Sequence, residues 1–337
     1  MGGSYEAPRD EGAMDAATEA MDAFEAGDGF ADMGETAVFD MASDMDSQGF
    51  QDLGGEGTLD MIENMGDSFM EMEGDQMAGA FSAMGHEDMQ GLGGDQVFEA
   101  AGNMEAADFQ SMGGDSALAM FDTMGHESAS DLGGDQLAGM FGAMDGDQLH
   151  SIGEDQLFHT AGEMTQENFL AMDADSAFGM FDAMGSDNAL ELEGDQMAGM
   201  FGAMDQEQIG GMHGDMVFDA FENMGTDGMM SLDGDSMAGM FDAMDSEHFL
   251  EIPGNEMFEM AGNMSGDNFS AMGSDSAFGM FDTMGADMVM DLEGDQLGGM
   301  LDAMGSEHFH EIGEDQMFEM AGNMSGDNFS AMGSDSA

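Results

Sequence analysis

Apolar residues follow one face of a helix in this chain, and the same pattern returns at every twentieth position. In the segment that begins at Asp315, the residues Met317, Met320, Ala321 and Met324 fall at positions i, i+3, i+4 and i+7. Residues with this spacing share one side of an α-helix. The pattern therefore predicts one amphipathic helix in each repeat.

A shorter apolar segment follows each predicted helix. Within 326–332 the residues Phe329 and Met332 are three positions apart, and 306–312 and 166–172 have the same spacing. Segments of this length suit one or two helical turns. Each repeat is therefore expected to consist of a helix, a turn, a short helix and a second turn.

Turn residues mark the ends of the predicted helices. Asp315 is expected to be an N-cap, because its carboxylate can accept the free N–H groups of the first turn. Gly85, Gly125 and Gly185 follow the last apolar residue of their helices. We expect these glycines to adopt the left-handed αL conformation that ends many helices.

The repeat is regular enough to fix the organisation of the chain. Asp recurs at every twentieth position from Asp75 to Asp315, with Asn255 as the exception, and every twentieth residue from Met84 to Met324 is Met. This register predicts thirteen regular units over 75–334 and three degenerate units over 14–74. Residues 1–13 are expected to form a tail or docking arm. Residues 335–337 are expected to begin a further unit of a truncated array.

Three unit types alternate, which gives a longer cycle of three repeats. The first type reads like GDQMAGMF, the second like EDQLFHTAGEM and the third like SDSAFGMF. The unit at Asp235 joins the start of the third type to the body of the first, which indicates that one unit has been lost there. This pattern is typical of recombination within a long array.

These observations predict an all-α fold, a tandem-repeat solenoid or superhelix of helix–turn–short helix units. Short helices are marginal alone, so stacking on neighbouring units must bury the Met and Phe stripe. A β-type solenoid is the alternative, because the chain contains 54 Gly, although Val, Ile, Thr and Tyr are scarce. Disorder is the third interpretation, because it is typical of a highly charged chain.

Short amphipathic helices alternate with Asp-capped turns along the chain. One example is the sequence MFDAM at Met240–Met244, which precedes a short helix. This pattern resembles the cytosolic superhelical domain of MgtE-type magnesium channels. The resemblance implies an α-solenoid and implies no channel function.

Charge narrows the range of partners. The chain has 74 Asp and Glu against one basic residue, Arg9, so its formal net charge is −73. Such a surface repels nucleic acid and anionic membranes and attracts cations or a basic protein. No apolar run is long enough for membrane insertion, and residues 1–12 do not form a Sec signal peptide. We expect an extracellular or cell-surface location reached by another route, with the cytoplasm of a halophile as the alternative.

Carboxylates at the predicted turns are the candidate metal ligands, since Ca²⁺ prefers oxygen ligands. No EF-hand or glycine-rich nonapeptide loop is present. Solvated capping residues are therefore the alternative interpretation. The candidate calcium ligands are the Asp residues that recur at every twentieth position: Asp75, Asp95, Asp115, Asp135, Asp155, Asp175, Asp195, Asp215, Asp235, Asp275, Asp295 and Asp315.

The Met and His side chains give weaker indications of a metal site or an active site. The spacing of Met197 and Met200 resembles that of thioether copper(I) sites, but Phe and Leu replace Met in the same register, which favours a core role. The eight His keep no common register and are expected on the surface. No catalytic motif is present, so we expect that the protein is not an enzyme.

Together these features predict a structural repeat protein that self-assembles into an extracellular filament, surface layer or adhesin stalk. Head-to-tail assembly with other copies and stabilisation by divalent cations are expected. The alternative function is an acidic binding module that captures calcium, copper or a basic protein partner.

Overall fold

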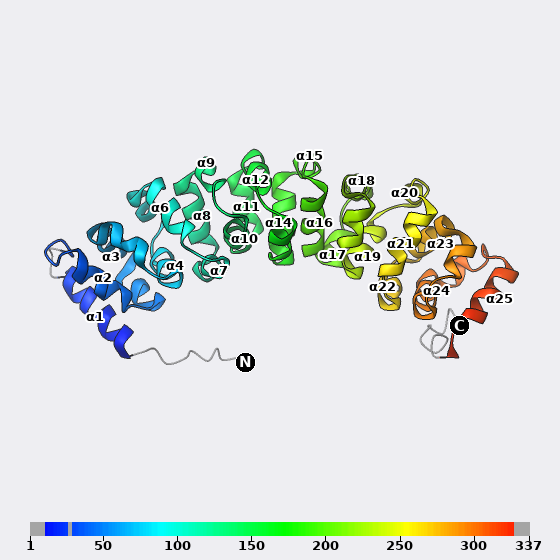
Figure 1. The fold of residues 1–337 in the computed structure, drawn as a ribbon, viewed down its shortest axis with the longest axis horizontal. Coiled ribbons are helices and arrows are strands. Elements are labelled where there is room, and N and C mark those ends of the chain that lie inside the picture. Colours follow the sequence, from blue (N-terminus) through cyan, green and yellow to red (C-terminus); the bar gives the residue numbers. More distant parts are fainter. Residues whose placement is uncertain (1–10, 26–28, 327–337) are drawn as a thin grey trace. The chain divides into compact units, whose positions relative to one another are not determined.

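The computed structural model describes residues 11–25 and 29–326, and this part of the chain is helical throughout without any β-strand (Figure 1). The all-α prediction is confirmed and the β-solenoid alternative is wrong for the described residues. Straight-chain Met, Leu, Glu and Gln favour helices, whereas the β-branched residues that favour strands are rare. The proposed arm up to residue 10 and the expected further unit at 335–337 lie outside the described residues.

The described helices comprise one 3₁₀-helix and many α-helices of varied length. Their bounds are α1 Glu11–Glu25, α2 Glu35–Ser43, α3 Ser47–Met65, η1 Gly66–Glu71, α4 Gly74–Ala83, α5 His86–Leu92, α6 Gly94–Gly102, α7 Ala106–Met112, α8 Gly114–Met124, α9 His126–Ala129, α10 Gly134–Gly142, α11 Gly146–Ile152, α12 Glu154–Ala161, α13 Gln166–Leu170, α14 Ala174–Met184, α15 Ser186–Ala189, α16 Gly194–Ala203, α17 Gln206–Gly210, α18 Gly214–Ser231, α19 Gly234–Ala243, α20 Ser246–Phe249, α21 Gly254–Asn263, α22 Gly266–Ala271, α23 Ser274–Val289, α24 Gly294–His308 and α25 Glu314–Asn323. None of the helices in the described part has the length and apolar character needed to cross a membrane.

The helices form two compact units. Within the described residues, the first unit contains the chain up to Met164 together with Asp182–Met184. The second contains Thr165–Phe181 and the chain from Gly185 onward. Each contact described below lies within one of these units.

Each regular repeat from 75 to 314 contains one long and one short helix, as the apolar spacing predicts. α10 and α11 form such a pair, and so do α16 and α17. In α18, α23 and α24 the two helices of one repeat run together across a glycine with positive φ: Gly225, Gly285 or Gly305. These longer elements are therefore two helices joined at a tight bend.

The turn chemistry differs from the sequence-based prediction. Gly125 has φ 76° and ψ 153°, which lies outside the αL region, and Gly85 has φ −83°. The repeated Asp is also not the N-cap. Asp75 is the second residue of α4, and Glu73 occupies the N-cap position. The error arises because Gln76, at the third helical position, accepts the Glu73 N–H with its side chain, so the helix starts before the Asp.

Methionine and phenylalanine side chains pack in the core of both units. Met77, Met197 and Met200 are buried. Phe121 and Phe141 bring their ring centroids to 5.8 Å, and Phe181 and Phe201 to 5.6 Å. Met adapts to the irregular spaces between short helices because its side chain is flexible and polarizable.

Long helices of the first unit type carry a glycine at the sixth position, and an earlier short helix lies against it. A Cβ on Gly199 would lie 2.6 Å from the carbonyl oxygen of Gln166, the first residue of α13. A Cβ on Gly139 would lie 2.5 Å from the Cα of Ala106, the first residue of α7. In each pair the two residues are 33 positions apart. The same offset relates Gly239 to Gln206 and Gly299 to Gly266.

A glutamine three positions before this glycine adds hydrogen bonds to the same contact. Gln296 Oε1 accepts the N–H of Glu293, and Nε2 donates to the carbonyl oxygen of Met264 at 2.7 Å. The same Nε2 also lies 3.2 Å from the oxygen of Gly262 and 3.3 Å from that of Ala261. One side chain thus caps the start of α24 and the end of α21.

The same clamp is present in the first unit. Gln136 makes the equivalent bonds to the carbonyl oxygens of Ala101, Gly102 and Met104. Its Oε1 accepts the N–H of Gly133 at the start of α10. The glutamine and the glycine of one long helix therefore act together on an earlier repeat.

Units of the second type lack the glycine contact. The sixth position of their long helices carries a charged or imidazole side chain that is exposed: Glu99, His159, Asp219 and Glu259. A long side chain there prevents the close backbone approach seen at Gly199. The three-unit cycle of the sequence therefore corresponds to a difference in how closely helices pack.

Replacing Gly199 with Ala should weaken the fold, whereas replacing Gly262 with Ala should strengthen it. The added methyl at position 199 meets the backbone of α13, and overpacking of this kind costs about 1–3 kcal/mol. A Cβ at Gly262 in α21 meets nothing within 4 Å, so the better helix propensity of Ala should contribute roughly 0.5–1 kcal/mol. Urea unfolding followed by circular dichroism measures both changes. Equal effects of the two substitutions would contradict the close contact at Gly199.

Candidate functional site

The Asp residues proposed as calcium ligands share one structural position. Asp115, Asp175 and Asp235 are each the second residue of a long helix, as Asp75 is in α4. A carboxylate in the first turn is stabilised by the positive end of the helix dipole. The register therefore places these side chains on helix starts instead of in the turns.

Several of these carboxylates accept a hydrogen bond from the short helix of the next repeat. Gln148 Nε2 donates to Asp115 Oδ1 at 2.7 Å. Gln208 Nε2 donates to Asp175 Oδ1 at 3.0 Å, and Asn268 Nδ2 donates to Asp235 Oδ1 at 2.5 Å. The amide group thus links two repeats. The fixed offset of 33 residues between Asp and the amide side chain is present in the sequence, but the apolar pattern along the chain does not indicate this link.

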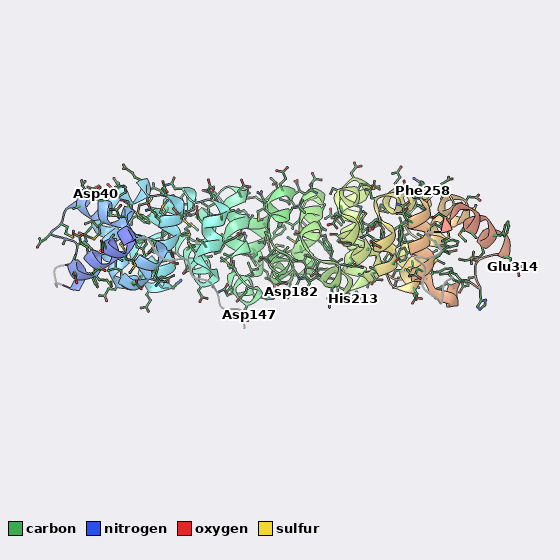
Figure 2. The ribbon with its side chains drawn as sticks, turned by 90° about the horizontal axis from the view of Figure 1, so that it is seen from below. Asp40, Asp147, Asp182, His213, Phe258 and Glu314 are labelled. Carbon is green, nitrogen blue, oxygen red and sulfur yellow. The ribbon has the colours of Figure 1, made fainter. Side chains whose placement is uncertain are left out.

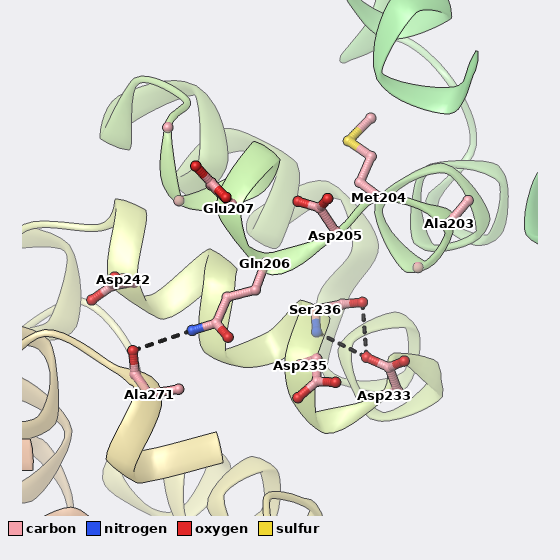
Figure 3. Close-up of a pocket in the computed structure, with 13 residues that line it drawn as sticks. Ala203, Met204, Asp205, Gln206, Glu207, Asp233, Asp235, Ser236, Asp242 and Ala271 are labelled. Carbon is pink, nitrogen blue, oxygen red and sulfur yellow. Dashed lines mark hydrogen bonds between the residues drawn. The ribbon is translucent and has the colours of Figure 1, made fainter. Parts of the chain in front are cut away.

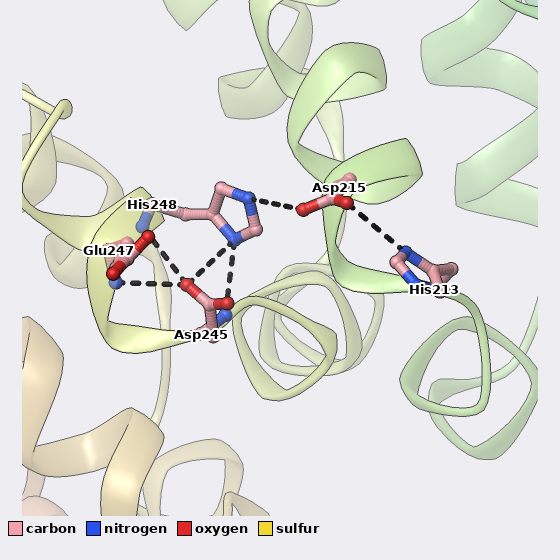
Figure 4. A network of polar contacts seen from close by, with 5 residues as sticks. All are labelled: His213, Asp215, Asp245, Glu247 and His248. Atoms are coloured by element: carbon pink, nitrogen blue, oxygen red, sulfur yellow. Dashed lines mark hydrogen bonds and ion pairs between the residues drawn. The ribbon is translucent and has the colours of Figure 1, made fainter.

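Histidine replaces the amide in two repeats. His248 Nε2 lies 3.2 Å from Asp215 Oδ1, and its Nδ1 accepts the backbone N–H of Asp245 (Figure 4). The same Nδ1 also lies 3.2 Å from Asp245 Oδ1. His213 Nδ1 approaches the other oxygen of Asp215 at 3.7 Å. Asp215 therefore lies between two imidazole rings.

His248 and His308 are not the surface residues that the sequence predicts. Their side chains are only 12% and 14% exposed, and each ring stacks on a phenylalanine one and a half repeats earlier. Phe218 and His248 have centroids 4.8 Å apart, and Phe278 and His308 4.5 Å. The imidazole of His248 both caps a short helix and stacks on Phe218. The sequence indicates this stack only when the 30-residue offset between Phe218 and His248 is known.

Carboxylates cover the outside of the helices, but they do not gather into a metal cage. Asp40, Asp147 and Asp182 project from the ribbon in Figure 2. Within residues 11–25 and 29–326, no three Asp, Glu or His side chains form a group that could hold a metal ion. Calcium binding by the repeated Asp residues stays a prediction.

The methionines proposed as copper ligands lie in the core. Met197 and Met200 of α16 are buried among the apolar side chains of the second unit. Met77 and Met84 are buried in the first unit. Burial among apolar groups favours the packing role over a thioether site.

Two grooves in the second unit collect carboxylates. The first has a volume of about 940 Å³ and contains Asp205, Glu207, Asp233, Asp235 and Asp242 among its lining residues (Figure 3). The second has a volume of about 840 Å³ and lies between α19, α20 and α23. Among the described residues, no lysine or arginine lines either groove.

No protein-family model matches the chain, and no curated protein matches it.

Replacing His248 should separate the contributions of its hydrogen bonds and of its stack on Phe218 to the stability of the fold. His248→Gln keeps a donor of the kind that Gln148 and Gln208 supply, but it loses the stack on Phe218, which costs about 0.5–1.5 kcal/mol. His248→Ala loses the stack and the hydrogen bonds, so its total cost should be larger by about 1 kcal/mol. Thermal unfolding of the unchanged protein and the two variants gives the order of their stabilities. A Gln variant as unstable as the Ala variant would contradict the role of the shared cap.

Proposed function

We propose that this protein is a structural scaffold without enzymatic activity, in which the repeats continue as a solenoid superhelix and copies join head to tail. The observation that carries the proposal is the recurrence of one inter-repeat contact. The glycine contact at Gly139 returns at Gly199, Gly239 and Gly299 with the same spacing to its partner. A chain built on one repeated interface can grow by adding units, because each new unit packs on the few units that come just before it.

An exposed aromatic ring offers a surface for such growth. Phe318 holds the same register position as Phe218 and Phe278, and it is 81% exposed. At Phe218 and Phe278 an imidazole of a later repeat covers the ring. In this proposal an imidazole or apolar side chain of a second copy covers the ring of Phe318 in the same way. Head-to-tail contacts that do not close on themselves produce filaments.

Divalent cations are part of the proposal because the charge must be balanced. The formal net charge is −73, and self-repulsion of this size opposes close assembly. Calcium bound by the repeated Asp residues, within one copy or between copies, would lower that repulsion. We therefore propose an extracellular or cell-surface filament, surface layer or adhesin stalk. The alternative is an acidic protein of a halophile's cytoplasm, where the charge keeps the surface solvated in salt.

Electron microscopy of the purified protein in millimolar calcium and in chelator tests the proposal. We expect regular filaments or sheets in calcium, because the cation neutralises the surface, and dispersal in chelator. Filaments in both conditions would retain the scaffold and assign assembly to apolar contacts. Isolated particles in both conditions would contradict the structural role.

Phe318→Ser should shorten the filaments without unfolding the protein. The side chain is exposed, so its loss should change the stability of one copy by at most about 0.5 kcal/mol. Sedimentation velocity measures the size of the assemblies. The control is Phe318→Leu, which keeps an apolar side chain and should keep assembly. Normal assembly of the Ser variant would exclude this surface from the contact.

An acidic binding module is the second candidate function, and the grooves favour it. No lysine or arginine is among their described lining residues, which include many carboxylates. These carboxylates are Asp205, Glu207, Asp233, Asp235, Asp242, Asp245, Asp275 and Asp282. Calcium, copper or a basic protein are the candidate ligands. Monodisperse protein that binds such a ligand would favour this function over the filament.

A further inference from the structure

The two grooves of the second unit adjoin at one residue. Asp242, near the end of α19, lines both of them. Its Oδ1 accepts the N–H of Gly273 at 2.6 Å and the hydroxyl of Ser276 at 3.1 Å, on the side of the second groove. Its Oδ2 lies toward Gly210, which lines the first groove. One extended ligand can therefore contact both grooves across Asp242.

The second groove differs from the first because it has an apolar side. The buried residues Met244 and Phe249 and the half-buried Phe278 are among the residues that line it. Leu250 lies at its edge and is 74% exposed. An exposed Leu beside a partly exposed Phe gives a ligand an apolar anchor point.

The register position of Leu250 accepts both polar and apolar residues, since Leu170, Leu190, Met230 and Met290 are also apolar. Most other repeats place a polar side chain or glycine at the register position of Leu250: Gln90, Gln110, Ser130, His150, Gly210, Ser270, His310 and Ser330. The stability of a repeat therefore does not require an apolar residue at this position. The leucine is free to serve a contact with a partner.

Negative charge surrounds this anchor point. Asp275 is 96% exposed and pairs with the imidazole of His308, while Asp245 contacts His248 and backbone N–H groups. Glu207 and Asp282 are exposed and line the first and the second groove, respectively. Because these carboxylates lie within a concave surface, their potentials add and attract a polycation.

We infer that the joined grooves bind an extended basic segment of a partner protein, with lysine or arginine side chains in the first groove and a large apolar side chain against Leu250 and Phe278. The occupant is not a second copy, because Arg9 is the one basic residue of the chain besides its eight His. Nucleic acid and acidic peptides carry the wrong charge. This inference rests on the second candidate function, the acidic binding module, and names its ligand and site; it is independent of the filament, whose contacts use Phe318 and the faces between repeats.

Fluorescence anisotropy with two labelled peptides tests the inference. The first probe has a run of lysines followed by leucine and phenylalanine, and the second has serine in place of the two apolar residues. We expect the first probe to bind more tightly, and both to weaken as salt rises, because charge contributes to both. Equal affinities for the two probes, or no binding of the first at low salt, would overturn the inference.

Leu250→Ser is the variant that locates the apolar anchor. It installs the residue found at Ser130 and Ser270, so the fold should be unchanged. Binding of the first probe should weaken by about tenfold, while binding of the second should not change. Leu170→Ser is the matched control, since it alters the same register position outside both grooves and should have no effect. Equal loss in both variants would overturn the assignment to this groove.

Replacing two carboxylates of the grooves tests whether the grooves bind the basic part of the segment. The double variant Glu207→Gln and Asp282→Asn removes two exposed carboxylates of the grooves, and both probes should bind several-fold more weakly. The double variant Asp187→Asn and Glu191→Gln removes two exposed carboxylates elsewhere in the same unit and should change binding little. Equal effects of the two double variants would show that net charge alone attracts the peptide and would overturn the inference.

Discussion

The close approach of two backbones at a glycine is the contact on which the repeat architecture depends. At Gly199 the first residue of an earlier short helix, Gln166, lies where any side chain would collide. The same long helix carries Gln196 three positions earlier, and that side chain is buried. In the equivalent helices Gln136 and Gln296 cap an earlier helix as well as their own. The sequence GDQxxG therefore combines a steric fit with a hydrogen-bonded clamp, and both act on helices too short to be stable alone.

This contact explains how an acidic chain can fold without basic residues in its packing. The core is made of Met and Phe, and the links between repeats use amide and imidazole donors instead of Lys or Arg. Asn268 and Gln148 donate to carboxylates at helix starts, where the helix dipole already stabilises negative charge. Most of the acidic side chains lie on the outside in the described part of the chain, where water and dissolved cations screen them. Charge is thus kept out of the packing and remains available for partners.

The sequence predicts the helices well because their signal is local. The stripe from Met317 to Met324 has the spacing of one helix face, and the described repeats contain the helices that such stripes predict. The features that differ from the prediction depend on hydrogen bonds at helix starts and on contacts across repeats. In α4 the cap from Gln76 places the helix start ahead of Asp75. His248 is largely buried because it stacks on Phe218, which lies one and a half repeats earlier in the chain. The candidate calcium ligands Asp75, Asp115, Asp175 and Asp235 lie in the first turn of a helix because each helix starts one residue before its Asp.

The unit at Asp235 shows why the order of repeat types can change without loss of packing. One unit is missing before it in the three-type cycle, yet its long helix keeps the third-type start, where Asp233 accepts the Ser236 N–H, and the first-type glycine at Gly239. That glycine lies against Gln206 of α17, at the same spacing as in the other glycine contacts. A glycine makes little demand on the side chain that it faces, because much of the contact is with backbone atoms. Repeats can therefore be gained or lost wherever this glycine remains, and sequence changes elsewhere in the unit are free to build features such as the groove at Leu250.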